Sequence, residues 1–219
     1  MLVGVISDVH GNRVALDAVL DDLPDVDTLI CAGDVVGYNP WPAACIDRLV
    51  ELEVPTVMGN HDRMLVTGSN FRGNRMARAG IELANEQLSA DQAAWLADLP
   101  NERLLFDERL QLVHGHPDDP DHYTYPKEFS PDLLDDSPVL VLGHTHIQSY
   151  QETDRGLILN PGSVGQPRDG DPRAAYAVLD LEGLSVELHR VPYDIDAVRE
   201  AIDAAGLPDR TGQRLVQGR

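Results

Sequence analysis

Lysine, cysteine and aromatic residues are all scarce in this sequence of 219 residues. Lys127 is its one lysine, so arginine supplies nearly every positive charge. The 17 lysines and arginines face 37 aspartates and glutamates, which gives a formal net charge of −20. Proteins that bind long nucleic acids do so largely by neutralising phosphates with basic side chains. The sequence therefore argues against an extended nucleic acid as a partner.

An excess of acid combined with so little lysine is typical of proteins that work at high salt, where ions screen the repulsion between like charges. We interpret the net charge of −20 as a halophile-like adaptation of the surface. On this interpretation the charge describes the habitat of the protein and gives no information about its substrate.

Long apolar runs are also missing, which excludes a segment that spans a bilayer. Residues 1–8 enter a strand pattern directly, with no basic leader, and this predicts a cytoplasmic protein. The two cysteines, Cys31 and Cys45, stand in apolar stretches where small buried thiols are common. We therefore expect buried thiols and neither a disulfide nor a thiol-metal site. Whether the chain forms a homo-oligomer is left open.

The apolar residues, 42% of the total, are sufficient for one compact core. We expect a single domain over residues 1–208 and a loose polar tail over 209–219. Strand patterns at 2–7, 28–32 and 55–58 alternate with helical patterns at 13–23, 43–52 and 75–99, the last with a helix start at Ser89. This alternation favours a mostly parallel sheet covered on both faces.

From residue 103 onward the pattern changes to short strands that predict hairpins. These strands are expected at 104–106, 110–114, 139–142, 157–159, 176–179 and 184–190. A final helix is expected at 194–205.

Potential metal ligands gather where five of the predicted strands end. They are Asp8, His10, Asp34, Asn60, His114, His144 and His146. In an open α/β sheet, ligands bind outside the carboxyl ends of the strands, so fragments distant in sequence are expected to meet in one crevice. Taken singly, each fragment has an ordinary explanation as a turn, a cap or a surface histidine. Taken together, they predict a site for two metal ions.

The same residues resemble the calcineurin-like metallophosphoesterases. The blocks of that family occur here in order as Asp8-Val9-His10, Gly33-Asp34, Gly59-Asn60-His61-Asp62, His114 and Gly143-His144-Thr145-His146. Residues 33–38 and 160–168 are similar to the small prokaryotic phosphodiesterase branch, whereas residues 39–42 depart from it and leave the substrate preference open. The resemblance implies an α/β fold, a four-layer αββα sandwich with two mixed sheets and the metal site at the carboxyl ends of the strands.

The resemblance also implies how the ligands are divided. One divalent ion is assigned to Asp8, His10 and His146, the other to Asn60, His114 and His144, with Asp34 bridging both. Imidazole with carboxylate suits Mn, which we favour, as well as Fe, Co, Ni or Zn. Two such ions roughly 3.5–4 Å apart clamp the entering and leaving oxygens of a displacement, and a hydroxide between them is the expected nucleophile.

Other side chains are candidates for direct contact with the substrate. We predict that His61 protonates the leaving group or stabilises the developing charge, with Asp62 holding its ring; simple phosphate binding by His61 is the alternative. Asn12 either contacts the substrate or caps a helix. Arg168 is the favoured arginine for the substrate phosphate, ahead of Arg63 and Arg72. Tyr123 belongs either to a pocket wall or to a plain surface loop.

The favoured function is a metal-dependent phosphodiesterase acting on a small phosphate ester. A phosphomonoesterase or nucleotide phosphatase is the alternative. A nuclease would need a basic track beside the site, and the sequence has none. The third class is a non-catalytic metal-binding scaffold, as in a related eukaryotic trafficking subunit. We rank it last because every expected ligand and His61 are present.

Overall fold

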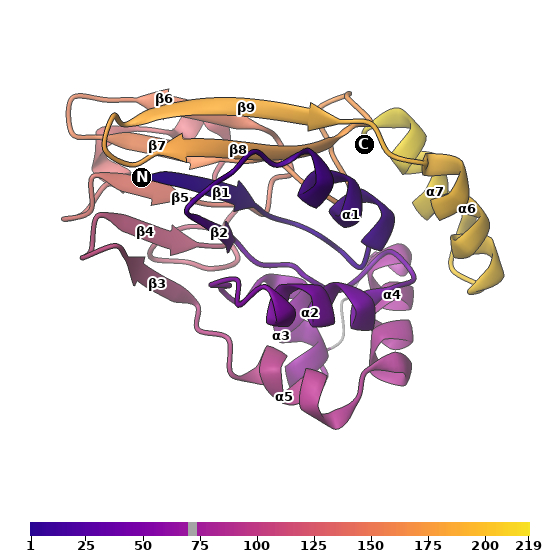
Figure 1. Cartoon of the computed structure of the whole chain (residues 1–219). Helices are drawn as coiled ribbons and strands as arrows, with labels where there is room; N and C mark the ends of the chain where they lie inside the picture. The colour runs from indigo at the N-terminus through magenta and orange to yellow at the C-terminus, as the bar shows by residue number, and fades with distance from the viewer. Residues whose placement is uncertain (70–73) are drawn as a thin grey trace.

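Two mixed β-sheets form the centre of the computed structural model, which describes residues 1–69 and 74–219 (Figure 1). The strands of the first sheet lie in the order β2 (Thr28–Cys31), β1 (Leu2–Ile6), β8 (Ala174–Asp180) and β9 (Ser185–Val191). Those of the second sheet are β3 (Glu102–Leu105), β4 (Leu110–Val113), β5 (Val139–Val141), β7 (Leu157–Asn160) and β6 (Ser149–Glu152).

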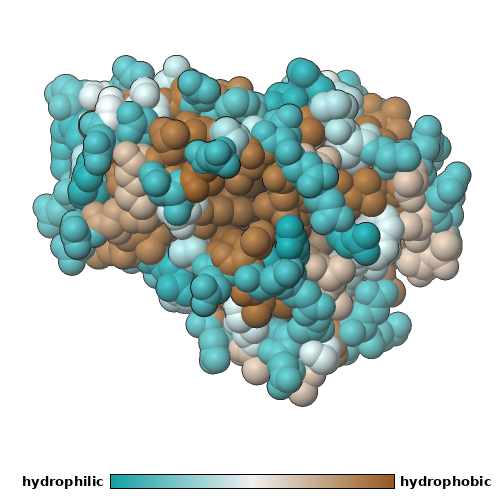
Figure 2. Space-filling model, in the orientation of Figure 1, coloured by the Kyte–Doolittle hydropathy of each residue, from teal (hydrophilic) through white to brown (hydrophobic). Residues whose placement is uncertain are grey.

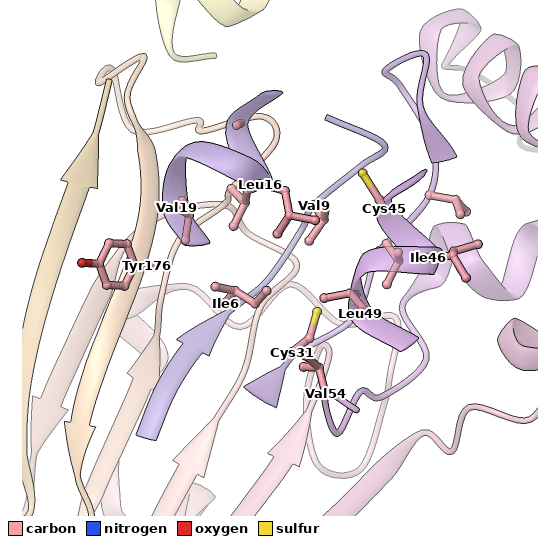
Figure 3. Close-up of a cluster of buried hydrophobic side chains, with 14 of the residues drawn as sticks. Ile6, Val9, Leu16, Val19, Cys31, Cys45, Ile46, Leu49, Val54 and Tyr176 are labelled. Atoms are coloured by element: carbon pink, nitrogen blue, oxygen red, sulfur yellow. The ribbon is translucent and has the colours of Figure 1, made fainter. Parts of the chain in front are cut away.

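Alternating side chains place the inner strands of the sheets between two apolar layers. Val3 and Val5 of β1 belong to the core between the two sheets, whereas Ile6 belongs to the core beneath the helices. The helical core receives side chains from α1 (Arg13–Asp22), α2 (Pro42–Glu51) and α5 (Ala90–Ala97). Figure 3 shows Leu16 and Leu49 from two of these helices on either side of Ile6.

The outer face of the second sheet has a thinner cover. It consists of Phe129 and Leu134 beside the 3-10 turns η1 (Pro126–Glu128) and η2 (Pro131–Leu133), packed against Leu140 and Ile158. The predicted α/β fold with two mixed sheets and flanking helices is therefore confirmed, and short 3-10 turns stand where the predicted αββα order has its second helical layer. On the face seen in Figure 2, apolar residues gather toward the centre and hydrophilic ones surround them. Within the described residues, no helix combines the length and the apolar character needed to cross a membrane.

Two predictions about strands are corrected. At 55–58 the structure has only an isolated bridge between Thr56 and Cys31, because Pro55 offers no N–H group and the chain soon turns into α3 (Asn60–Thr67). The strands β4, β5 and β7 are parallel neighbours and not hairpins. Sequence reasoning missed β6, which pairs antiparallel with β7.

The helical regions also differ from the prediction at three points. The pattern at 75–99 is two helices, α4 (Arg75–Gln87) and α5, and the predicted start at Ser89 is confirmed by its capping box with Gln92. The Asn60 block, for which no helix was predicted, is the first turn of α3. Residues expected to form a loose tail make α7 (Asp209–Gln217), because Leu215 packs with Val198 of α6 (Ile195–Ala204).

Candidate metal centre

The loops that follow β1, β2, β4 and β5 meet at one edge of the sandwich. Parallel pairing brings the carboxyl ends of β1 and β2 together, and likewise those of β4 and β5. Asp8 then joins the two sheets, because its Oδ2 accepts hydrogen bonds from the Ser7 hydroxyl at 2.7 Å and the His144 backbone N–H at 3.1 Å. The backbone N–H of Asp8 donates to the Gly33 carbonyl at 2.9 Å, which fixes the position of Asp34 beside it.

Six of the seven predicted ligands form two groups that share a carboxylate. The first group is Asp8, His10, Asp34 and His146, and the second is Asp34, His114 and His144. Within each group the candidate ligand atoms lie within 4.8 Å of one another, and all of these residues are buried. The seventh residue, Asn60, places its Oδ1 3.2 Å from His114 Nε2.

Backbone carbonyls orient the histidine rings. The Nδ1 atoms of His10, His114 and His146 lie 3.1, 2.7 and 2.6 Å from the carbonyl oxygens of Val36, Ala32 and Gln166. His144 is reversed, with Nε2 3.3 Å from the Asp121 carbonyl. A ring nitrogen that faces a carbonyl is protonated, and in a neutral ring this leaves the other nitrogen as a lone pair directed into the site.

This arrangement fits a cation. The Nε2 atoms of His10 and His146 face one another at 3.1 Å, and with both protons on Nδ1 neither can donate to the other. Asp8 Oδ1 is buried and lies 3.1 Å from His146 Nε2, so it faces an unprotonated nitrogen when the proton of His146 is on Nδ1. Lone pairs and a carboxylate oxygen directed into one small space repel each other unless a positive ion lies among them. The donor set of imidazoles and carboxylates is the one that manganese, iron, cobalt, nickel and zinc accept.

The backbone is strained where it presents the ligands. Positive φ angles occur at Asp8 (53°), His10 (48°), Asp34 (54°), His144 (67°) and His146 (59°). This region costs a non-glycine residue of order 1 kcal/mol or more, so the surrounding hydrogen bonds must hold it in place. Space also limits the residue at position 59. A Cβ at Gly59 would clash with Asp34 Oδ1.

Charge and burial set the protonation of the ligands. Burial lowers the pKa of His10 and His146, and lowers that of His144 to about 3, so these rings are neutral at pH 7. Burial also lowers the pKa of His114, but the adjacent Asp34 outweighs it and raises the pKa to about 9. Burial raises the pKa of Asp34, yet His114 and His61 hold it well below its usual value. In the metal-free protein His114 therefore holds a proton that a metal ion must displace.

His61 lies beside the ligands without belonging to either group. Its ring centroid is 4.7 Å from that of His10, and its backbone N–H donates to Asp34 Oδ1 at 2.8 Å. Burial lowers the pKa of His61 to about 4, so the ring is neutral at pH 7. A neutral imidazole carries one N–H that it can donate.

The Asp62 carboxylate accepts hydrogen bonds from backbone N–H groups. Its Oδ1 accepts from the N–H groups of Val35 and Val36 at 3.0 and 3.1 Å, and its Oδ2 accepts from Gly59 at 3.0 Å. Burial, reinforced by the charge of Asp34, raises the pKa of Asp62 to about 7. These bonds fix the loop after β2 against α3. That Asp62 also holds the His61 ring stays a prediction.

The structure separates the remaining candidates. Asn12 is fully buried, its Oδ1 accepts from Ala15 N at 3.2 Å and its Nδ2 donates to the Gly165 carbonyl at 3.1 Å. This geometry favours the capping interpretation over substrate contact. Arg63 forms an ion pair with Asp121, and Arg72 lies outside the described residues. Arg168 borders the site, with its backbone N–H donating to the His146 carbonyl at 3.2 Å.

Two tyrosines complete the surroundings of the ligands. Tyr123 stacks on His144 with ring centroids 3.7 Å apart, and both line a cavity of about 300 Å³ together with Asn60. Tyr123 thus forms a pocket wall, one of its two predicted placements. Tyr38 was given no role from the sequence, yet its ring centroid lies 4.8 Å from those of His10 and His61. Its position directly after Gly37 was the available signal.

Comparison with known proteins identifies the family. The family model of the "Calcineurin-like phosphoesterase superfamily domain" matches residues 1–184. The chain belongs to this superfamily. An uncharacterized protein of Methanocaldococcus jannaschii is 32% identical to this phosphoesterase over 245 residues, which cover 100% of this chain and 98% of the relative. Phosphodiesterase YfcE of Escherichia coli is 30% identical over 190 residues, covering 82% and 88% of the two chains.

A solved structure agrees over the full length of the phosphoesterase. The crystal structure of a metallophosphoesterase from Sphaerobacter thermophilus superimposes with a TM-score of 0.87 at 36% sequence identity. The match covers 100% of this chain and 99% of that one. The predicted family and fold are therefore confirmed, and the protein is a hydrolase of phosphate esters.

Proposed function

We propose that this phosphoesterase is a phosphodiesterase that hydrolyses a small phosphate ester in the cytoplasm with two divalent metal ions, manganese being favoured. The supporting observation is the Asp34 carboxylate, which is common to both groups of candidate ligands. Asp8, His10 and His146 would hold one ion with Asp34, and Asn60, His114 and His144 the other. The similarity to phosphodiesterase YfcE favours diesters as the substrate class.

When bound, the ions would supply positive charge for the phosphate oxygens and lower the pKa of a water molecule. The protein contributes a rigid arrangement of ligands. Burial keeps His10, His144 and His146 neutral and ready to bind a metal. The hydrogen bonds from the rings to backbone carbonyls hold the lone pairs in place before the substrate arrives.

We propose that His61 acts on the leaving group of the ester. Its neutral imidazole lies against His10 at the edge of the ligand cluster and is only 4% exposed. An N–H donor in that position would donate a hydrogen bond to the departing oxygen and stabilise its developing charge, which matters far more for an alkoxide than for a nitrophenolate. We expect H61A to slow the hydrolysis of a phosphodiester with an alkyl leaving group much more than that of the matching phosphodiester with a nitrophenyl leaving group. An equal loss on both esters would contradict the role and favour simple phosphate binding.

The function is tested by hydrolysis of bis-p-nitrophenyl phosphate with added manganese. We expect turnover by the wild-type protein and a loss of at least about 100-fold in D34A, because both ions lose a shared ligand. Metal analysis after gel filtration should show that the manganese content of D34A falls as well. D17N is the matched control, since Asp17 is an exposed partner of Arg13 on α1. No turnover by the wild type with any divalent metal would favour the scaffold alternative.

A further inference from the structure

A cavity of about 300 Å³ lies beside Asn60 and His144, two candidate ligands of the same ion. Both side chains belong to its lining, together with further residues of α3 and of the loop after β4. A substituent on a phosphate held at Asn60 and His144 therefore has direct access to this cavity. The chemistry of the other lining residues decides which substituents it can bind.

The cavity presents an aromatic surface next to the ligands. Tyr123 stacks on His144, with ring centroids 3.7 Å apart and planes inclined by 22°. The ring of Tyr125 is nearly parallel to that of Tyr123, at 6.2 Å and 19°. Both tyrosines are 39% exposed, so a ligand can reach them. An accessible aromatic ring beside a binding site is a surface on which a planar group stacks.

The remaining walls suit an uncharged group. Arg63 and Asp121 of the lining form an ion pair with each other, so their charges offset one another. Met64 adds an apolar side chain, which is only 7% exposed. A second phosphate in this cavity would meet the Asp121 carboxylate and would have to compete with it for Arg63. A flat ring without charge has no such cost.

The position of His61 indicates which side of the ester the cavity serves. The ring of His61 packs against those of His10 and Tyr38, with centroids 4.7 and 4.8 Å away. None of these three side chains belongs to the described lining of the cavity. A leaving group beside His61 therefore lies outside the cavity. The group that the cavity can receive is the one that stays on the phosphate.

We propose that this cavity binds a planar, uncharged ring on the alcohol that remains esterified to the phosphate, and that Tyr123 provides the stacking surface. The inference rests on the proposed phosphodiesterase function, because it requires a phosphate with two ester groups. It narrows the substrate class to diesters whose retained alcohol carries such a ring, as a nucleoside does. The cavity places no restriction on the leaving group.

The kinetic test compares two diesters with the same leaving group, both with manganese. They are the p-nitrophenyl ester of thymidine 5′-phosphate and methyl p-nitrophenyl phosphate. The wild type should prefer the thymidine ester in kcat/KM by about tenfold or more, since stacking of one base on an aromatic ring has an effect of that size. Because the leaving group is common to both, the ratio of the two kcat/KM values reports on the retained group.

Variants of Tyr123 separate substrate contact from support of His144. Y123A should lose most of the preference, and Y123F should keep it, because the ring makes the stack and the hydroxyl does not. Y150A is the matched control, since Tyr150 of β6 is 41% exposed and does not line the cavity. If Tyr123 only supports His144, Y123A will slow both esters by the same factor. An unchanged ratio in Y123A, or no preference in the wild type, would overturn the proposal.

A binding measurement distinguishes failure of this inference from failure of the proposed function. Thymidine 5′-phosphate and methyl phosphate carry the same charged group, and calorimetry on manganese-loaded protein compares their Kd values. We expect thymidine 5′-phosphate to bind about tenfold or more tightly, with the difference lost in Y123A and kept in Y150A. Absence of turnover on both diesters, with this difference intact, would count against the phosphodiesterase and support the ring site. Equal or undetectable binding of the two monoesters would overturn the ring site.

Discussion

At the scale of single residues, the ring of His61 depends on the missing side chain of Gly37. A Cβ at Gly37 would lie 2.4 Å from His61 Nδ1, whereas a Cβ at Gly170 would meet nothing within 4 Å. Both glycines have positive φ angles, 96° and 89°, so alanine strains the backbone to a similar extent at each, by about 1 kcal/mol or more. The two sites therefore separate backbone strain from displacement of the ring.

We expect G37A to lower kcat/KM for a phosphodiester with an alkyl leaving group at least about tenfold, because a displaced His61 can no longer stabilise the departing oxygen. G170A should retain most of the activity and lose only stability. Steady-state kinetics and chemical unfolding of the two variants provide the measurement. Similar activities for G37A and G170A would mean that the position of His61 is unimportant.

The two thiols give a prediction about pH. Burial raises the pKa of Cys31 and Cys45 well above the ordinary value of 9.0. A group whose pKa is raised on folding stabilises the native state fully below the pKa of the unfolded chain and loses that contribution as the pH rises above it. The free energy of unfolding of the wild type should therefore exceed that of C45A by less at pH 10 than at pH 7.5. Chemical denaturation at both pH values measures the gap, and a gap that widens would contradict the argument.

Reactivity checks the same burial independently. Native protein should give no reaction with a disulfide reagent at pH 8, because both thiols are inaccessible and protonated. Unfolded protein should react with two equivalents.

At the scale of elements, the helices begin where side chains supply acceptors for free N–H groups. Ser89 Oγ accepts from Gln92 N at 3.2 Å, and Gln92 Oε1 accepts in return from Ser89 N at 3.0 Å. Loss of such a cap costs about 1 kcal/mol. We expect S89A to lower the free energy of unfolding by this amount. S89D should keep most of the capping contribution. S185A, at the exposed start of β9, should change the free energy of unfolding little. Urea unfolding decides, and equal effects of S89A and S185A would exclude a capping contribution.

The third helix shows why an element can be essential to a site without a strong signal in the sequence. Asn60, His61 and Asp62 occupy the first turn of α3. The Asp62 carboxylate accepts hydrogen bonds from the N–H groups of Gly59 and of the loop after β2. The first turn of the helix, which contains Asn60, is thus connected to the loop that holds Asp34. A short polar segment with glycine favours a loop on local grounds, and only the contact with the other loop makes it helical.

At the scale of the whole molecule, the net charge of −20 opposes the compact state through repulsion. At 1 M salt the screening length falls to about 3 Å, so this repulsion nearly disappears. We expect the unfolding temperature to rise by about 5 °C or more between 0.1 and 1 M KCl. Sucrose at matched osmolality is the control for effects other than screening. A constant or falling unfolding temperature in KCl would contradict the halophilic interpretation of the surface.

The sequence by itself determined the types and order of the candidate metal ligands, since Asp8, Asp34 and His144 each follow a recognisable strand within a family pattern. Buried strands and capped helices were also predictable, because periodic burial and N-caps depend on neighbours in the chain. Tertiary structure alone decided that β4 and β5 are parallel, that Asn12 Nδ2 is bound to the Gly165 carbonyl, and that the polar end folds into α7 against α6. Those outcomes depend on contacts between segments far apart in sequence, whose energies no local pattern records.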